Sequence, residues 1–179
     1  IEQYEKTMVS YNSRFDKYSR GELLLTDAEL RGLDIFKTEK GDCFHCHSST
    51  APEVFISPDR TFANNGLDSV SSVLDFTDFG LGKFTRNTDD NGRFKIPTLR
   101  NLAFSAPYMH DGRFATLDEV IDFYNDGPKG SPTLEPIIRE KANKRVELTG
   151  HWGLSLSAQD KADLKAFLSI YSLLIESTI

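Results

Sequence analysis

Three stretches of the chain combine a helix-capping sequence with apolar residues at helical spacing. The caps are Thr-Asp-Ala-Glu at 26–29, Thr-Leu-Asp-Glu at 116–119 and Ser-Ala-Gln-Asp at 157–160. In each cap, a hydroxyl and an acidic side chain three residues later can satisfy each other's backbone N–H groups. The apolar positions of these stretches are Leu30, Leu33, Ile35 and Phe36; Leu117, Val120, Ile121 and Tyr124; and Leu164, Phe167, Leu168, Tyr171, Leu174 and Ile175. The pattern therefore predicts three amphipathic helices.

The rest of the chain shows little periodicity. Residues 1–21 have weak helical spacing at their start, and from about 48 to 95 neither a helical nor a strand period is sustained. Proline and glycine punctuate this middle region. An irregular stretch of that length is unusual in a compact domain unless it surrounds something. We expect a mostly α fold in which short helices are joined by long irregular loops, with almost no strands.

Length and composition narrow the class of protein. The 179 residues suffice for one domain with a sizeable core, so we expect residues 1–179 to form a single domain. The net charge of −6 argues against nucleic-acid binding through a basic surface. No stretch approaches the ~20 apolar residues of a membrane span. The chain begins at Ile1 without a leader sequence, so we expect a processed product or part of a longer protein.

Both cysteines lie in one short motif, Cys-Phe-His-Cys-His at 43–47. Cys-x-x-Cys-His is the attachment sequence of c-type haem. Two thiols at this spacing can form thioethers to one porphyrin, and the adjacent histidine can offer an imidazole nitrogen to the iron. Cys43 and Cys46 are therefore predicted to anchor one haem c covalently, with His47 as the proximal iron ligand. His45 occupies a variable position of the motif, and we expect it to point away from the iron.

Three alternatives to haem attachment are open for this motif. A redox disulfide would need a βαβ setting, which the pattern does not indicate. A zinc site would need a second Cys or His pair at suitable spacing, and the sequence has none. The motif could also occur by chance. Haem attachment is favoured because the motif contains both cysteines and follows a predicted helix. Since such attachment takes place outside the cytoplasm, it implies a periplasmic or otherwise extracytoplasmic protein.

A second informative block comprises Phe-Lys-Ile-Pro-Thr-Leu-Arg-Asn-Leu at 94–102 and Ser-Ala-Pro-Tyr-Met-His-Asp-Gly-Arg-Phe at 105–114. With Asn-Ser-Arg-Phe-Asp at 12–16, Asn-Gly-Leu at 65–67 and Asp-Phe-Gly at 78–80, it resembles the C-terminal half of the bacterial di-haem cytochrome c peroxidase family, which includes MauG. The resemblance spans nearly the whole chain. It implies a cytochrome c-like domain that carries the electron-transfer haem, and a partner N-terminal peroxidatic haem domain that is absent from this sequence.

The resemblance also bears on the sixth ligand of the iron. In typical members this ligand is a methionine fourteen residues after the histidine of a Pro-Tyr-x-His motif. Counted from His110, the position is Tyr124, and MauG similarly has a tyrosine there. An ordinary core tyrosine is one alternative. Ligation by Met109, a soft thioether beside His110, is another. The resemblance places His110 in the haem pocket as a hydrogen-bonding group.

Calcium and a haem propionate are two further candidate ligands. The family holds a calcium ion between its haem domains, partly through backbone carbonyls at positions that correspond to Ser105 and Pro107. The remaining calcium ligand would come from the absent domain. Arg100 is a candidate to pair with a haem propionate through its planar guanidinium. A surface or interdomain ion pair is the alternative for Arg100.

The resulting hypothesis is an oxidoreductase. The full-length protein would reduce hydrogen peroxide with electrons that a donor cytochrome or another small redox protein delivers through the haem of this domain. No catalytic residue for peroxide cleavage can be assigned in this chain. The alternatives are a stand-alone mono-haem electron-transfer cytochrome, a MauG-like oxidase acting on a protein substrate, and a haem-free interaction module. The sequence leaves a homodimer open.

Overall fold

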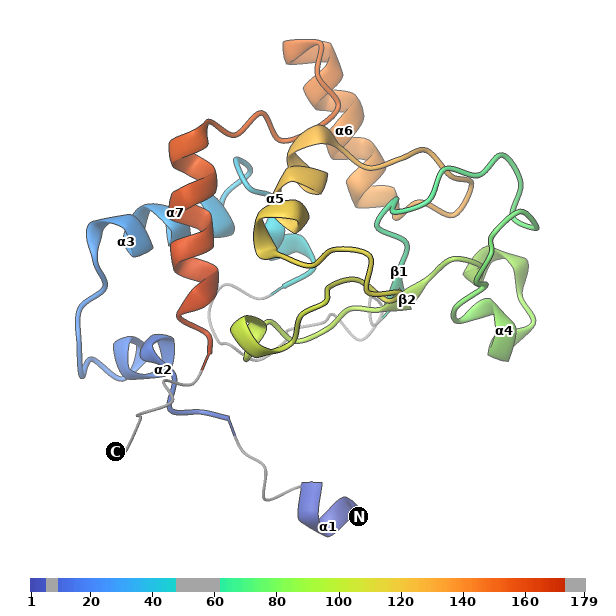
Figure 1. The fold of residues 1–179 in the computed structure, drawn as a ribbon. Coiled ribbons are helices and arrows are strands. Elements are labelled where there is room, and N and C mark those ends of the chain that lie inside the picture. The colour runs from blue at the N-terminus through green and yellow to red at the C-terminus, as the bar shows by residue number, and fades with distance from the viewer. Residues whose placement is uncertain (6–9, 48–61, 173–179) are drawn as a thin grey trace.

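The structure, a computed structural model, describes residues 1–5, 10–47 and 62–172. Its elements are mostly short helices (Figure 1). In chain order they are α1 (Glu2–Glu5), α2 (Arg14–Ser19), α3 (Asp27–Lys37), the 3₁₀ helix η1 (Cys43–His45), β1 (Phe62–Ala63), α4 (Gly82–Thr85), the 3₁₀ helix η3 (Thr88–Asp90), β2 (Phe94–Lys95), the 3₁₀ helix η4 (Leu102–Phe104), α5 (Leu117–Asp126), α6 (Pro136–Thr149) and α7 (Ala158–Ser169). The mostly α fold with long irregular connections is confirmed.

Among the described elements, α3 and α7 make the most extensive contact, and they cross at one side of the molecule (Figure 1). Gly32 of α3 permits the close approach, because a Cβ at this position would lie 2.0 Å from the Asp163 carbonyl oxygen and 2.6 Å from Phe167 Cβ. The rings of Phe36 and Phe167 meet across the crossing, with centroids 5.3 Å apart. α5 packs beside α7, so the predicted inner face of α5 is directed toward this core.

The hydrophobic core collects apolar residues from both ends of the chain. Phe15 of α2 stacks on Tyr171, which follows α7, with ring centroids 4.6 Å apart. The core comprises Phe15, Leu25, Leu33, Ile35, Phe36, Leu102, Leu117, Ile121, Leu156, Leu164, Phe167, Leu168, Ile170 and Tyr171. Cys43 and Tyr108 pack against it, half-buried. The core is therefore continuous with the motif that carries the cysteines.

The three predicted capping boxes are present. Thr26, Thr116 and Ser157 each accept a hydrogen bond from the backbone N–H three residues later, and the acidic side chain of that residue bonds back to the cap. Of the apolar positions expected on the last helix, Leu174 and Ile175 lie outside the described residues. Part of the irregular middle region, 48–61, also lies outside them.

The helix α6 and the strand pair of β1 and β2 are among the elements that the sequence pattern does not predict. The fourteen-residue helix α6 has a single fully buried residue, Ala142, so no apolar stripe indicates it. It begins with Pro136 in its first turn, where proline is favoured, and ends at Gly150 in the left-handed conformation. The antiparallel pair of β1 and β2, with Phe62 opposite Lys95, is too short to produce an alternating pattern.

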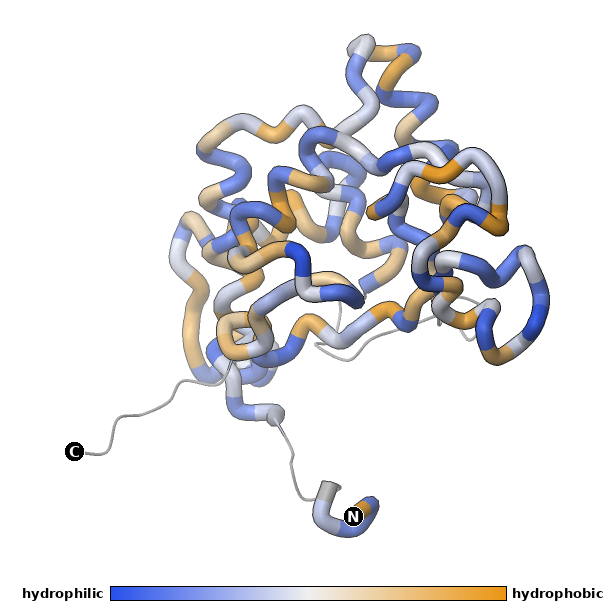
Figure 2. Tube along the Cα trace, turned by 45° about the vertical axis from the view of Figure 1, so that its right-hand side comes forward, coloured by the Kyte–Doolittle hydropathy of each residue, from blue (hydrophilic) through white to orange (hydrophobic). Residues whose placement is uncertain are grey.

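Apolar and polar segments alternate along the described residues of the trace (Figure 2). Within the described residues, no helix combines the length and apolar character that a membrane crossing requires.

Candidate functional site

The Cys-x-x-Cys-His motif forms a compact turn that begins with the 3₁₀ helix η1. Asp42 enters the turn in the left-handed conformation (φ 59°). The backbone N–H groups of Cys46 and His47 both donate to the Cys43 carbonyl, at 3.2 and 2.9 Å. The Cys43 thiol donates to the Gly41 carbonyl at 3.2 Å, and the two cysteines are not joined in a disulfide. Both thiols and the imidazole are therefore carried by a single turn that hydrogen bonds define.

Burial sets the protonation states of the motif. It raises the pKa of the Cys43 thiol to about 12 and lowers the pKa of His47 to about 4. At neutral pH the His47 imidazole is thus uncharged, which leaves one ring nitrogen with a lone pair for a metal ion. His47 Nδ1 is buried without a hydrogen-bond partner among the described residues. A neutral imidazole beside the protonated Cys43 thiol fits the chemistry of a c-type haem site.

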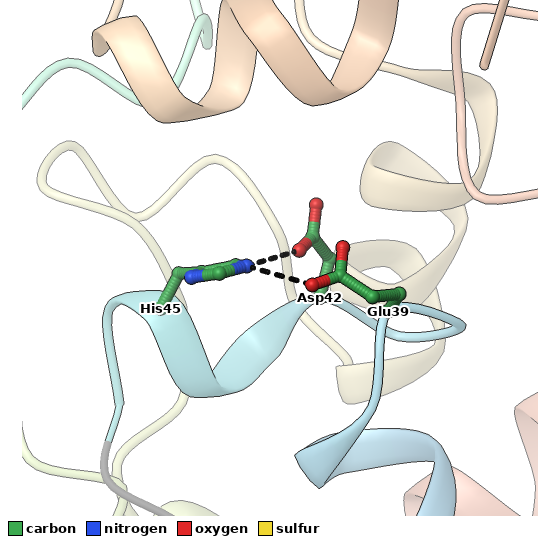
Figure 3. A group of neighbouring side chains, drawn as sticks. All are labelled: Glu39, Asp42 and His45. Carbon is green, nitrogen blue, oxygen red and sulfur yellow. Dashed lines mark ion pairs between the residues drawn. The ribbon is translucent and has the colours of Figure 1, made fainter. Parts of the chain in front are cut away.

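The His45 side chain extends toward two carboxylates at one side of the turn (Figure 3). His45 Nε2 lies 3.0 Å from Asp42 Oδ1 and 3.5 Å from Glu39 Oε1, close enough for ion pairs when the ring is protonated. These three groups have the spacing of a metal cluster. Lys141 of α6 already pairs with Glu39 at 2.6 Å, and Arg145 of α6 pairs with Asp42. We therefore interpret the cluster as an ion-pair network that fastens the turn to α6.

The side chains of Tyr124 and Met109 both contact the side-chain amide of Asn65. Asn65 Nδ2 donates to the Tyr124 hydroxyl oxygen at 3.1 Å and to the Met109 sulfur at 3.6 Å. Burial raises the pKa of Tyr124 to about 12, which the Asn65 hydrogen bond partly offsets. A thiolate at Cys46 or Cys43 would raise the pKa of Tyr124 further. The Tyr124 phenol therefore lies within electrostatic range of both cysteines.

Arg100 has a carboxylate partner inside the chain. Its two terminal nitrogens donate to the oxygens of Asp16 in α2, at 3.1 and 3.0 Å, and both side chains are largely buried. Ser13 also donates to Asp16 from its backbone N–H and its hydroxyl. The ion pair is thus neither a surface pair nor one that needs a second domain. A propionate contact would have to compete with Asp16 for Arg100.

The remaining predicted residues lie at the surface. His110 is exposed, and its ring stacks on Phe94 of β2 with centroids 3.5 Å apart. Ser105 and Pro107 are exposed in the loop that follows η4. Their calcium role would rest on backbone carbonyls and stays a prediction.

Two residues of the site are not identified as functional by the sequence. Asn-Gly-Leu at 65–67 is one of the motifs that carry the family resemblance, but the sequence gives Asn65 no role, and this residue lies 59 positions from Tyr124 in the chain. Asp42 lies outside the Cys-x-x-Cys-His motif and is the N-cap residue of η1, without a side-chain cap hydrogen bond. No local signal indicates the role of either residue, because their partners come from distant elements.

A helical domain built around a Cys-x-x-Cys-His turn, with an inward phenol, defines a c-type cytochrome domain. No family model matches the chain. It is 32% identical over 96% of its length to cytochrome-c peroxidase IdrP2 of Denitromonas iodatirespirans, covering 47% of that protein. It is 30% identical over 92% of its length to MauG of Methylorubrum extorquens, covering 40% of it.

Solved structures point to the same family. A MauG-like protein associated with microbial copper homeostasis has 37% sequence identity and a TM-score of 0.65, over 92% of this chain and 49% of that one. The chain therefore belongs to the family of di-haem cytochrome c peroxidases and MauG. It spans about half the length of the curated relatives it matches.

Proposed function

We propose that residues 1–179 are the electron-transfer haem domain of a di-haem cytochrome c peroxidase. The observation that carries the proposal is the single Cys-x-x-Cys-His turn with a neutral His47 whose Nδ1 is buried, in a chain that spans about half the length of its relatives. A second haem domain, N-terminal and peroxidatic, would complete the enzyme. The full protein would then reduce hydrogen peroxide with electrons from a donor cytochrome or another small redox protein, in the periplasm.

Each residue of the site has a role in this proposal. Cys43 and Cys46 would hold the haem through thioethers, and His47 would provide the proximal nitrogen. Tyr124 would be the sixth ligand, with Met109 as the alternative. A haem bound in this way supplies one-electron transfer. The calcium ion, held partly by the carbonyls of Ser105 and Pro107, would lie toward the second domain.

The side chains of this site favour electron transfer over reaction with peroxide. A phenol that reaches the iron leaves no open position for a substrate. Tyr124 is half-buried, and its hydrogen bond to Asn65 orients the phenol within the protein itself. The chain's part in the reaction is therefore to bind and orient the haem and to keep peroxide away from it.

One observation favours a second function, a MauG-like oxidase that acts on a protein substrate. The MauG-like protein associated with copper homeostasis is 37% identical to this chain over the aligned half of that protein. The family resemblance also gives MauG a tyrosine at the position of Tyr124. Both functions assign the same electron-transfer role to this domain. They differ in the substrate of the complete protein.

The proposal is tested with this chain matured in a host that attaches c-type haem. We expect mass spectrometry to show one haem that stays bound after denaturation, and turnover with peroxide and a reduced cytochrome far below that of a complete di-haem relative. Cys43→Ala/Cys46→Ala should lose the covalent haem, whereas His45→Ala, within the same motif, should keep it. Haem that acid acetone extracts, or turnover equal to that of a complete enzyme, would refute the assignment.

A further inference from the structure

The Asn65 carboxamide lies between the two side chains that compete for the sixth position. Its nitrogen is 3.1 Å from the Tyr124 oxygen and 3.6 Å from the Met109 sulfur. We propose that Asn65 is a positioning residue that holds the Tyr124 phenol toward the iron and keeps the Met109 thioether from replacing it. This inference rests on the proposed haem site and adds the residue that selects its sixth ligand.

The backbone on both sides of Asn65 is held firmly. The buried Asn64 side chain donates to Ser131 Oγ at 2.9 Å and to Thr133 Oγ1 at 3.0 Å. Its Oδ1 accepts the Gly66 N–H at 2.9 Å, and its carbonyl accepts the Glu135 N–H at 3.0 Å. Asn65 is thus presented from a turn that distant residues 131–135 hold in place.

Gly66 closes the turn against the same segment. Its φ of +76° is one that side-chain-bearing residues rarely adopt. A Cβ at this position would lie 2.6 Å from Pro128 Cβ and 2.8 Å from the Lys129 carbonyl oxygen. The Gly66 carbonyl accepts the Lys129 N–H at 2.7 Å. The turn therefore has little freedom to carry the Asn65 amide elsewhere.

Met109 is held in an unusual conformation. Its φ of 72° lies in the left-handed region, which a residue such as methionine seldom adopts. The flanking backbone is tied by the Tyr108 N–H, which donates to the Phe114 carbonyl at 2.7 Å. The Met109 sulfur, which accepts a hydrogen bond from Asn65, belongs to this constrained loop. Tyr124 belongs to the last two turns of α5. Separate elements thus bring both candidate ligands to one amide.

The hydrogen-bonding capacity of these groups explains the selection. A carboxamide nitrogen has two N–H donors, so Asn65 can serve both neighbours at once. The phenol oxygen accepts one of them at an ordinary distance and keeps a further lone pair for a metal ion. The sulfur, a weak acceptor, is engaged at the longer distance. Without the two donors, the phenol loses its orientation and the thioether is released.

The test compares Asn65→Leu with the wild type, both as the haem-loaded full chain. We expect Asn65→Leu to gain the long-wavelength charge-transfer band of haem–thioether ligation in the ferric spectrum, and its reduction potential to rise, because methionine ligation favours the ferrous state. Adding Met109→Leu should remove the new band. Asn143→Leu makes the same chemical change at an exposed position of α6 and should leave both readouts unchanged.

Two further variants make the outcome decisive. Asn65→Asp keeps the shape but loses both donors, so it carries the same test if circular dichroism shows that Asn65→Leu is unfolded. Tyr124→Phe tests the ligation itself: an unchanged ferric spectrum would overturn the Tyr124 assignment and the positioning role with it. If Tyr124→Phe alters the spectrum while both Asn65 variants keep the wild-type spectrum and potential, only the role of Asn65 is refuted.

Discussion

Among individual residues, the buried pair of Asp16 and Arg100 illustrates how the site region is held together. Burial by itself raises the pKa of Asp16, but the hydrogen bonds from Arg100 and Ser13 outweigh it and leave the pKa below its ordinary value. The carboxylate also belongs to the capping box of α2, since it accepts the Ser13 N–H at 2.8 Å. The Asp16 side chain therefore joins α2 to the segment that precedes η4.

The lowered pKa of Asp16 predicts a loss of stability in acid. Its contribution is complete above about pH 4, where an unfolded aspartate is ionised, and is lost as the pH falls through the lower value of the folded state. We expect Asp16→Asn to reduce the free energy of unfolding by about 1–3 kcal/mol at neutral pH, because Arg100 stays buried without its carboxylate. The deficit should shrink toward about pH 3.

Urea unfolding of both proteins at the two pH values measures this effect. Asp34→Asn removes the same charge at an exposed position of α3 and should change stability little. A deficit of equal size at both pH values would contradict the pH dependence assigned to Asp16.

At the level of secondary-structure elements, the α3–α7 crossing is the contact on which the fold depends. Glycine within a helix is normally unfavourable relative to alanine, by about 1 kcal/mol. At Gly32 the preference is reversed, because a Cβ would collide with the backbone of α7, at the Asp163 carbonyl. The close approach allows the rings of Phe36 and Phe167 to pack against each other. Phe36 lies near the end of α3, and the Cys-x-x-Cys-His turn is the next element in the chain.

Gly32→Ala is therefore expected to destabilise the chain despite the higher helix propensity of alanine. Overpacking of this kind costs about 1–3 kcal/mol. Gly130→Ala is the matched control, since a Cβ there meets no atom within 4 Å. Denaturant unfolding should give a clearly lower free energy of unfolding for Gly32→Ala than for Gly130→Ala. A Gly32→Ala protein as stable as the Gly130→Ala protein would show that the helices can separate at little cost.

At the scale of the whole molecule, ion pairs connect α6 to the Cys-x-x-Cys-His turn. Lys141 and Arg145 pair with Glu39 and Asp42, which lie more than a hundred residues earlier in the chain. Because Arg145 and Asp42 are both largely buried, their pair is screened less by solvent than a surface ion pair. The network thus fastens a mostly exposed helix to the turn that carries the two cysteines.

We expect Arg145→Ala to lower the free energy of unfolding by about 1–3 kcal/mol, since Asp42 loses its partner. A double-mutant cycle with Asp42→Ala should give a coupling energy of about 0.5–3 kcal/mol. Lys144→Ala removes a charge from an exposed position on the same helix and should have little effect. Additive effects of Arg145→Ala and Asp42→Ala would show that the pair does not hold α6 to the turn.

Local chemistry made part of this protein predictable from its sequence. The capping boxes at Thr26, Thr116 and Ser157 involve residues three apart, so the same short pattern that predicts each helix start also forms it. The Cys-x-x-Cys-His motif is equally local, because a single turn carries both thiols and the imidazole. The inward position of Tyr124 follows from the spacing of apolar residues on one helix.

Other features depend on contacts between distant segments. α6 has no apolar stripe, and its ion pairs come from residues around position 40. The partners of Asn65 and Arg100 are 59 and 84 residues away along the chain. A local pattern contains no information about which distant side chains will meet, because packing of the whole chain decides that. The sequence by itself thus determined the capped helices and the haem-binding motif, and only the tertiary structure decided that Asn65 stands between Tyr124 and Met109.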